Sequence, residues 1–225
     1  MKLVFLGDSL TAGRYGGDFV AEVARLMPDD EIINAGQGGN TVINLMRRLE
    51  DDVLALEPDG VFVMVGGNDS ISYGNPVTRP YYKKAQNIPE GFVSPEQYEQ
   101  TYRNLLHELQ ANRIQAWVGL APKEYNPETI NMQKQFNTIA ADVAQSFNIP
   151  TLDIMAYFNP QNVKERPAIG IDMITLIGKR QSAGWADYET EQQREGYQFT
   201  FDGLHLIPQA AKEIGQLVAE FIRQN

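Results

Sequence analysis

Five short runs rich in apolar residues punctuate the chain, and most of them end at a glycine or just before a proline. They occupy residues 2–6, 31–35, 60–65, 116–120 and 151–154. A short and nearly continuous apolar run is typical of a strand that is buried on both faces, as the strands of parallel sheets are. The pattern therefore predicts five strands of one parallel sheet.

Apolar residues between these runs recur at the spacing of amphipathic helices. The stripes lie within residues 42–56, 98–109, 136–147 and 214–222, with a shorter one near residues 18–27. Ser94, Pro95 and Gln97 supply a start signal for the second of these helices, as cap, first helical position and capping-box partner. Buried strands that alternate with such helices predict a three-layer α/β/α sandwich around a five-stranded parallel sheet.

Two segments, residues 70–93 and 159–200, fit no simple element. Loops of that length inside a compact domain are usually functional or contain structure that the pattern hides. Their aromatic residues are Tyr73, Tyr81, Tyr82, Phe92, Trp185, Tyr188, Tyr197 and Phe199. Because no linker or internal repeat interrupts the chain, we expect residues 1–225 to form one domain in which these two insertions shape the wall or lid of a pocket.

Composition and charge exclude several classes of protein. The chain has 19 basic and 29 acidic residues and a net charge of −10, which argues against binding to nucleic acid or to an anionic membrane surface. It has no cysteine, which excludes disulfides, thiolate metal sites and cysteine nucleophiles. No apolar run reaches the roughly 18 residues of a membrane span. Because residues 2–6 resemble a strand rather than a signal peptide, we expect a cytoplasmic protein.

Polar and glycine-rich motifs follow three of the predicted strands. They are Gly-Asp-Ser-Leu at residues 7–10, a glycine-rich loop at residues 36–41, and Gly-Gly-Asn-Asp at residues 66–69. Open α/β sheets bind ligands at the carboxyl ends of their strands, so we expect these motifs to lie together. Glycines that precede a helix expose N–H groups that suit an anion, and the Asn68 carboxamide can donate to a developing oxyanion.

A fourth motif, Asp-Gly-Leu-His at residues 202–205, lies near the end of the chain. A carboxylate at this spacing can accept the Nδ1–H of His205 and leave Nε2 free as a base. The other histidine, His107, lies off the apolar stripe of its helix, so we expect it to be solvated. Each of the four motifs taken alone also fits an ordinary turn or helix cap.

Together and in this order, the four motifs resemble those of the SGNH hydrolase superfamily, also called GDSL esterases and lipases. The resemblance implies that Ser9 is the nucleophile, that His205 is the general base and that Asp202 orients His205. It also implies a flavodoxin-like strand order, 2-1-3-4-5, and activity without a metal or an organic cofactor.

The same resemblance implies an oxyanion hole made of three donors. These are the backbone N–H groups of Ser9 and Gly39 and the side chain of Asn68. Gly38 replaces Gly39 if the register of the glycine loop is shifted by one residue. The two long segments depart from the compact family pattern, so they leave the substrate undetermined.

These features predict a serine hydrolase that cleaves a small-molecule carboxylic ester through an acyl-enzyme, because a serine hydroxyl needs an adjacent base. Two substrate classes remain open. Aromatic walls favour a carbohydrate O-acetylesterase, whereas the apolar residues within 173–177 favour a lipid-ester or acyl-thioester hydrolase. The sequence does not specify the oligomeric state.

Two interpretations other than ester hydrolysis also exist for the same motifs: a non-hydrolytic binding domain and a phospho-receiver domain. A non-hydrolytic binding domain on the same scaffold predicts a damaged triad or oxyanion hole, and here every position is filled. A phospho-receiver domain would use Asp8, Asp69 and Asp153, but it also needs a lysine soon after the last strand, which is missing.

Overall fold

A computed structural model of residues 1–225 contains one five-stranded sheet in the order β2-β1-β3-β4-β5. The four neighbouring pairs of strands are all parallel. The strands are β1 (Lys2–Gly7), β2 (Glu31–Gly36), β3 (Gly60–Met64), β4 (Gln115–Leu120) and β5 (Thr151–Asp153). The expected fold class and strand order are therefore confirmed.

Alternation along the strands explains why the sequences of β1, β3 and β4 are almost entirely apolar. In β1, Val4 and Leu6 belong to one hydrophobic core, and Leu3 and Phe5 belong to the other. Successive side chains of a strand point to opposite faces of the sheet, so a strand covered on both faces has no position for a polar residue. The edge strand β2 is only partly buried, and its sequence contains Glu31 and Asn34.

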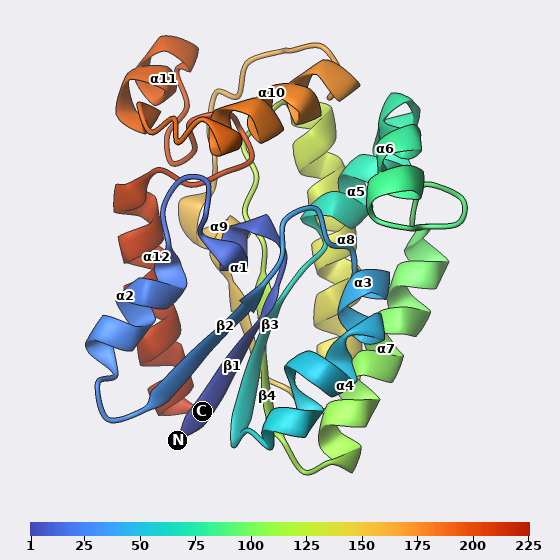
Figure 1. Ribbon diagram of the computed structural model, residues 1–225, viewed down its shortest axis with the longest axis vertical. Coiled ribbons are helices and arrows are strands. Elements are labelled where there is room, and N and C mark those ends of the chain that lie inside the picture. The colour runs from blue at the N-terminus through green and yellow to red at the C-terminus, as the bar shows by residue number, and fades with distance from the viewer.

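Helices cover both faces of this sheet (Figure 1). One face packs against α3 (Val42–Arg47), α7 (Pro95–Ala111) and α8 (Pro127–Ser146), and the other packs against α2 (Phe19–Leu26) and α12 (Pro208–Gln224). The predicted stripes of these helices face the cores. None of the helices is both long and apolar enough to cross a lipid bilayer.

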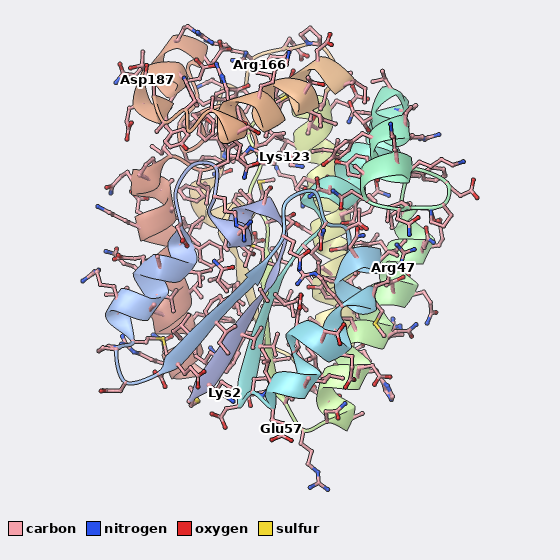
Figure 2. The ribbon with its side chains drawn as sticks, viewed as in Figure 1. Lys2, Arg47, Glu57, Lys123, Arg166 and Asp187 are labelled. Atoms are coloured by element: carbon pink, nitrogen blue, oxygen red, sulfur yellow. The ribbon has the colours of Figure 1, made fainter.

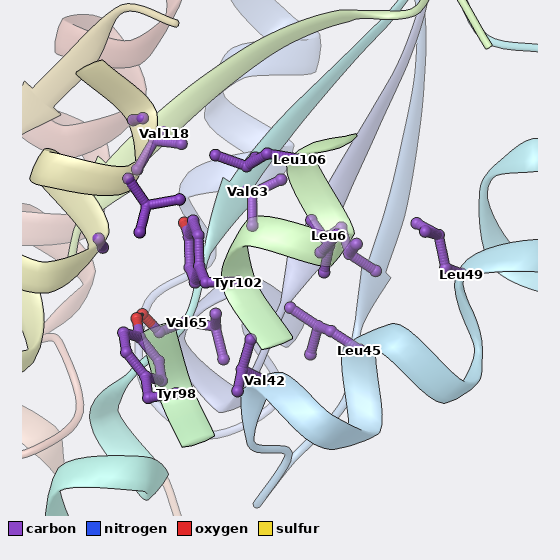
Figure 3. Packing of buried hydrophobic residues seen from close by; sticks show 14 of the residues in the cluster. Leu6, Val42, Leu45, Leu49, Val63, Val65, Tyr98, Tyr102, Leu106 and Val118 are labelled. Atoms are coloured by element: carbon purple, nitrogen blue, oxygen red, sulfur yellow. The ribbon is translucent and has the colours of Figure 1, made fainter. Parts of the chain in front are cut away.

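The larger core joins the sheet to α7, as Figure 3 shows for Val63, Tyr98 and Tyr102. The Tyr98 hydroxyl donates to the carbonyl of Val65, 3.0 Å away, just beyond β3. The predicted cap and start of the helix are confirmed, because the Ser94 side chain accepts the N–H of Gln97 at 3.2 Å and Pro95 is the first helical residue, but the Gln97 side chain does not complete a capping box. Helix α7 thereby supports the strand end from which residues 66–69 extend.

The stripe within residues 42–56 does not form a single helix, contrary to the simplest prediction from its period. It is divided into α3, α4 (Leu49–Asp52) and the short η1 (Leu54–Leu56). The first break is at Arg48, whose guanidinium donates to the Gly7 carbonyl and to Asn40 Oδ1, both at 2.9 Å. These contacts with distant loops are tertiary, so the helical period does not reveal them.

The two long segments contain helices rather than irregular loops. The first overlaps α5 (Gly67–Gly74) and contains η2 (Pro76–Thr78) and α6 (Arg79–Ala85). The second contains α10 (Ile171–Ser182) and α11 (Tyr188–Glu195). The short helices α1 (Ser9–Ala12) and α9 (Ile154–Phe158) directly follow β1 and β5.

Helices α10 and α11 cross the carboxyl ends of the strands, at the end of the molecule opposite both termini (Figure 1). The two long segments also contact each other, because the N–H of Ile169 donates to Asn75 Oδ1 at 3.1 Å. The sheet edge that was expected to carry the polar motifs is therefore covered.

Asp69 joins two of the turns at this edge. Its side chain is fully buried in the first turn of α5 and accepts the N–H of Val42, 3.0 Å away, at the start of α3. Burial raises the pKa of the Asp69 carboxyl to about 8, although the hydrogen bond from Val42 opposes that shift. Asp69 is therefore largely protonated at neutral pH.

We expect Asp69→Asn to reduce the pH dependence of stability. An acid with a raised pKa in the folded state stabilises the fold fully below its unfolded pKa, about 3.9. That stabilisation is lost as the pH rises through the folded value of about 8. Between pH 5 and 7.5 the unfolding free energy of the wild type should fall relative to that of the variant, by at most about 1.4 kcal/mol per pH unit. Urea denaturation at both pH values tests this, and parallel pH profiles would contradict it.

Candidate active site

Ser9, His205 and Asp202 form one hydrogen-bonded row, although 196 positions separate Ser9 from His205. The Nε2 atom of His205 lies 3.1 Å from Ser9 Oγ, and its Nδ1 atom lies 2.8 Å from Asp202 Oδ2. The other carboxylate oxygen of Asp202 accepts two backbone N–H groups, from His205 at 2.7 Å and from Leu204 at 2.9 Å. The structure thus brings the three residues together in the order that the sequence predicted.

The turn after β1 presents Ser9 to solvent from an otherwise buried strand. Asp8 caps α1 by accepting the N–H of Leu10 at 3.0 Å, so Ser9 is the first helical residue. A Cβ atom at Gly7 would lie 2.1 Å from Thr11 Oγ1, so only glycine allows this tight entry into the helix. The same turn therefore both caps α1 through Asp8 and exposes the Ser9 hydroxyl to the cleft.

A second turn, immediately before α12, places His205. Gly203 has a φ of +83°, and a Cβ atom there would lie 2.7 Å from the Tyr125 backbone. Tyr15 contacts the imidazole edge to face, with ring centroids 5.1 Å apart. One edge of the imidazole faces Asp202 and the other faces Ser9. His205 is only 6% exposed, so the ring has little contact with water.

Glu124 holds the chain that leads into this turn. Its buried carboxylate accepts the backbone N–H groups of Gln198, Phe199 and Thr200 and also the Thr200 hydroxyl. The Thr200 hydroxyl in turn accepts the N–H of Gly203 at 3.1 Å. A residue just beyond β4 therefore fixes the approach to Asp202 and His205.

The electrostatics of Asp202 keep it ionised. Burial by itself raises the pKa of this carboxyl, but the neighbouring His205 and the hydrogen bonds from His205 and Leu204 outweigh that effect and lower it. An ionised acid at this position accepts Nδ1–H and favours the tautomer in which Nε2 carries a lone pair. That lone pair is 3.1 Å from the serine oxygen.

The residues of the predicted oxyanion hole, Ser9, Gly39 and Asn68, all line one cleft, and so does the alternative Gly38. Gly38 and Gly39 donate no backbone hydrogen bond within the chain, so both N–H groups are free. Gly39 has a φ of +80°, and a Cβ atom there would lie 2.6 Å from the Tyr81 hydroxyl. The N–H of either Gly38 or Gly39 is therefore available as the glycine-loop donor of the expected oxyanion hole.

Asn68 lies at the same cleft in a fixed orientation. Its Oδ1 accepts the Tyr82 hydroxyl at 3.0 Å, and its Nδ2 donates to the Asn40 carbonyl at 3.0 Å. A longer contact, 3.3 Å, joins Nδ2 to Asp8 Oδ2. The second N–H of the amide is thus only weakly engaged, which leaves it available to a stronger acceptor.

A buried lysine lies beneath this cleft. Figure 2 shows Lys123 between the sheet and α10, and its side chain is 3% exposed. Its ammonium donates to the Gly67 carbonyl at 2.9 Å, one residue before Asn68. Burial lowers the pKa of Lys123 to about 8, while the nearby carboxylates of Asp8 and Asp69 oppose the shift. Burial likewise raises the pKa of Asp8.

The cleft above Ser9 has a volume of about 420 Å³ and is lined by both long segments. Those segments contribute Ile71, Tyr81, Tyr82, Ile169, Met173, Ile174, Ile177, Gly178 and Gln181. Among the aromatic residues that the sequence singled out, only Tyr81 and Tyr82 line the cleft. Trp185 and Tyr188 pack against Tyr15 and Phe201, and Tyr73 packs against Phe92.

Sequence reasoning missed Lys123, Glu124 and Tyr15. The first two lie in the connection just after β4, which ends at Leu120, and the rule that placed Ser9 and Asn68 at strand ends could have indicated them. The predicted exposure of His107 is confirmed. Of the three acids that a phospho-receiver domain would use, Asp153 is exposed and caps α9 by accepting the N–H of Ala156 at 2.8 Å. Asp8 and Asp69 are buried, so the three acids lie in different environments.

A family model and a curated relative match this chain. The GDSL-like lipase/acylhydrolase family model matches residues 5–209. An acetylxylan esterase of Geobacillus stearothermophilus is 30% identical over an alignment of 181 residues, which covers 70% of this chain and 78% of that protein.

Solved structures share the fold at lower identity. The acetyl xylan esterase AlAXEase has a TM-score of 0.68 and 20% identity, covering 99% of this chain and 100% of its own. A catalytic mutant of the G. stearothermophilus acetylxylan esterase, with alanine in place of a serine, has a TM-score of 0.65 and 22% identity, covering 99% and 92%. The chain therefore belongs to the GDSL-like lipase/acylhydrolase family and is a carboxylic-ester hydrolase.

Proposed function

We propose that this hydrolase removes acetyl groups from a carbohydrate, with Ser9, His205 and Asp202 as its catalytic triad. The observation that carries the catalytic assignment is the row of contacts at 3.1 Å and 2.8 Å on the floor of the cleft. The carbohydrate assignment is supported by the acetylxylan esterase relative, whose identity to this chain reaches 30%.

In the proposed reaction, His205 Nε2 takes the proton of the Ser9 hydroxyl while Oγ attacks the ester carbonyl carbon. The imidazolium then gives that proton to the oxygen of the leaving alcohol, and the carbon–oxygen bond breaks to leave an acetyl group on Ser9. Water enters, loses a proton to Nε2 and attacks the acetyl carbonyl. The imidazolium returns that proton to Ser9 Oγ as the bond between Oγ and the acetyl carbon breaks, so acetic acid leaves and the serine hydroxyl is restored.

Negative charge develops on the carbonyl oxygen in both halves of this cycle. The proposed hydrogen-bond donors to that oxygen are the Ser9 and Gly39 N–H groups and Asn68 Nδ2, with Gly38 as the alternative to Gly39. Donors that are already oriented lower the barrier, because they need no reorganisation when the charge appears. The hydrogen bond from Tyr82 to Asn68 supports this role, since it holds the amide in one orientation.

A second candidate substrate is an ester with a longer acyl chain. The observation that favours it is the apolar face that α10 turns to the cleft through Met173, Ile174 and Ile177. The same side chains suit the acetyl proposal if they narrow the acyl side of the cleft. The two candidates therefore differ in how far an acyl chain can extend beneath α10.

We expect Ser9→Ala to lower kcat toward p-nitrophenyl acetate by about 10⁴-fold or more, because no other nucleophile replaces the hydroxyl. A serine-directed phosphonate should add its mass to the wild type and not to the variant. Ser182→Ala, at the exposed end of α10, is the matched control and should retain activity. Near-normal turnover by Ser9→Ala would refute the nucleophile, and inertness of the wild type to both reagents would favour a binding domain.

We expect Asn68→Ala to lower kcat by about 10²- to 10³-fold with little change in KM, because the contact with the oxyanion strengthens in the transition state. Tyr82→Phe should cause a smaller loss of kcat, since the amide remains but its orientation is less restricted. Steady-state kinetics with p-nitrophenyl acetate measure both. A change confined to KM would instead assign Asn68 to substrate binding.

We expect kcat/KM to fall by about tenfold or more from p-nitrophenyl acetate to p-nitrophenyl octanoate. The apolar side chains of α10 close the acyl side of the cleft and leave no space for the added methylenes. Ile174→Ala should raise octanoate turnover by opening that wall. Leu176→Ala is the matched control, because Leu176 is exposed on the same helix and does not line the cleft. Octanoate turnover by the wild type that equals acetate turnover would support the longer-chain candidate.

A further inference from the structure

A second hollow continues from the active-site cleft across the end of β2. It has a volume of about 600 Å³ and shares Arg14 and Gly38 with the cleft that contains Ser9. A Cβ atom added at Gly38 would meet no other atom within 4 Å, so the protein leaves free space beside this shared residue. The two hollows therefore adjoin at the glycine loop.

The second hollow, which we call the β2 groove, differs in chemistry from the cleft beneath α10. Its polar side chains are Arg14, Asn34, Gln37, Asp51 and Asp52. The apolar lining of the first cleft comes largely from α10 and from the 70–93 segment, and none of those residues reaches the β2 groove. The two sides of Ser9 thus present an apolar arm and a polar arm.

Several polar groups of the β2 groove have no partner within the protein. Arg14 and Asp51 are exposed, and neither side chain makes a hydrogen bond or an ion pair with another residue. The amide nitrogen of Gln37 donates to Asp52 at 3.2 Å, while its amide oxygen accepts no hydrogen bond. The hollow therefore has a free hydrogen-bond donor, the Arg14 guanidinium, and free acceptors, the Asp51 carboxylate and the Gln37 amide oxygen.

Apolar groups also line the β2 groove. Ile33, Ala35 and Leu56 line it and are only partly buried, because β2 is an edge strand with a single neighbour. A surface that combines a few apolar patches with free donors and acceptors matches a sugar, whose rings have C–H faces and hydroxyl edges. The groove contains more acidic than basic side chains and the chain carries a net charge of −10, so an anionic glycan is disfavoured.

We propose that the β2 groove is a binding site for the leaving group and holds the neutral oligosaccharide from which the acetyl group is removed. This inference rests on the proposed function and adds to it that the substrate is an acetylated chain of several sugars rather than a single sugar. The acetyl group lies beneath α10, the ester oxygen lies at Ser9, and the carbohydrate crosses Gly38 to reach Gln37 and Asp51.

The test compares kcat/KM for p-nitrophenyl acetate, acetylated xylose and acetylated xylotetraose. The test protein carries Gln37→Ala and Asp51→Ala together. The control protein carries Glu50→Ala and Gln145→Ala, which likewise remove one acid and one glutamine, at exposed positions outside the β2 groove. Glu50 is the immediate neighbour of Asp51 in α4, so the control also measures any effect of losing an acid from that helix.

In the wild type and the control, kcat/KM should rise by about tenfold from acetylated xylose to the tetrasaccharide, as expected when extra hydrogen bonds form in the groove. The rise should shrink to about twofold or less in the test protein through a higher KM, with p-nitrophenyl acetate unaffected. The assignment of the β2 groove as the oligosaccharide site is overturned if kcat/KM for acetylated sugars does not depend on chain length. It is also overturned if the dependence on chain length persists in the test protein. Cleavage of p-nitrophenyl acetate without turnover of any acetylated sugar overturns the carbohydrate substrate itself.

Discussion

The parallel pairing of β1 with its two neighbours is the constraint on which the cleft depends. Gly7, the last residue of β1, is in register with Gly36 of β2 and with Met64 of β3. Neighbouring strands are about 4.8 Å apart, so three connecting turns must begin almost side by side. Those turns carry Ser9, the glycine loop and Asn68. No long-range side-chain contact is needed to bring these groups to the same edge.

His205 reaches the same place by a different route, which starts at the other end of the chain. Helix α12 packs closely on α2, since a Cβ atom at Gly215 would lie 2.6 Å from the Cβ of Glu22. This packing sets where the chain enters α12, and Glu124 holds the strand-like segment just before it. The position of the base therefore depends on tertiary packing and on one buried carboxylate, not on strand register.

The floor of the cleft contains three buried ionisable side chains. Asp8, Asp69 and Lys123 are each almost fully buried, and isolated charges are costly in such surroundings. Here the ammonium of Lys123 lies near the carboxylates and donates to the Gly67 carbonyl. The perturbed pKa values follow from this burial, and groups of this kind cluster at functional sites. One of these groups, Lys123, is hydrogen-bonded to the residue that precedes Asn68.

The sequence by itself determined the class of fold and indicated the candidate triad and oxyanion donors. Apolar runs show where strands are buried, because both faces of a covered strand must avoid polar atoms. Strand order and the matched motifs then place Ser9, Asn68 and the glycines at one edge. The triad also follows from the sequence as a hypothesis, since only His205 has an acid three residues upstream.

Only the tertiary structure decided what surrounds those groups. The break at Arg48, the Glu124 contacts and the placement of α10 over Ser9 each depend on side chains from distant parts of the chain. The division of the cleft into an apolar arm and a polar arm has the same origin. Periodicity describes only local geometry, which repeats every two or 3.6 residues. Contacts between segments far apart in sequence leave no such period, so the shape of the cleft became visible only in the folded chain.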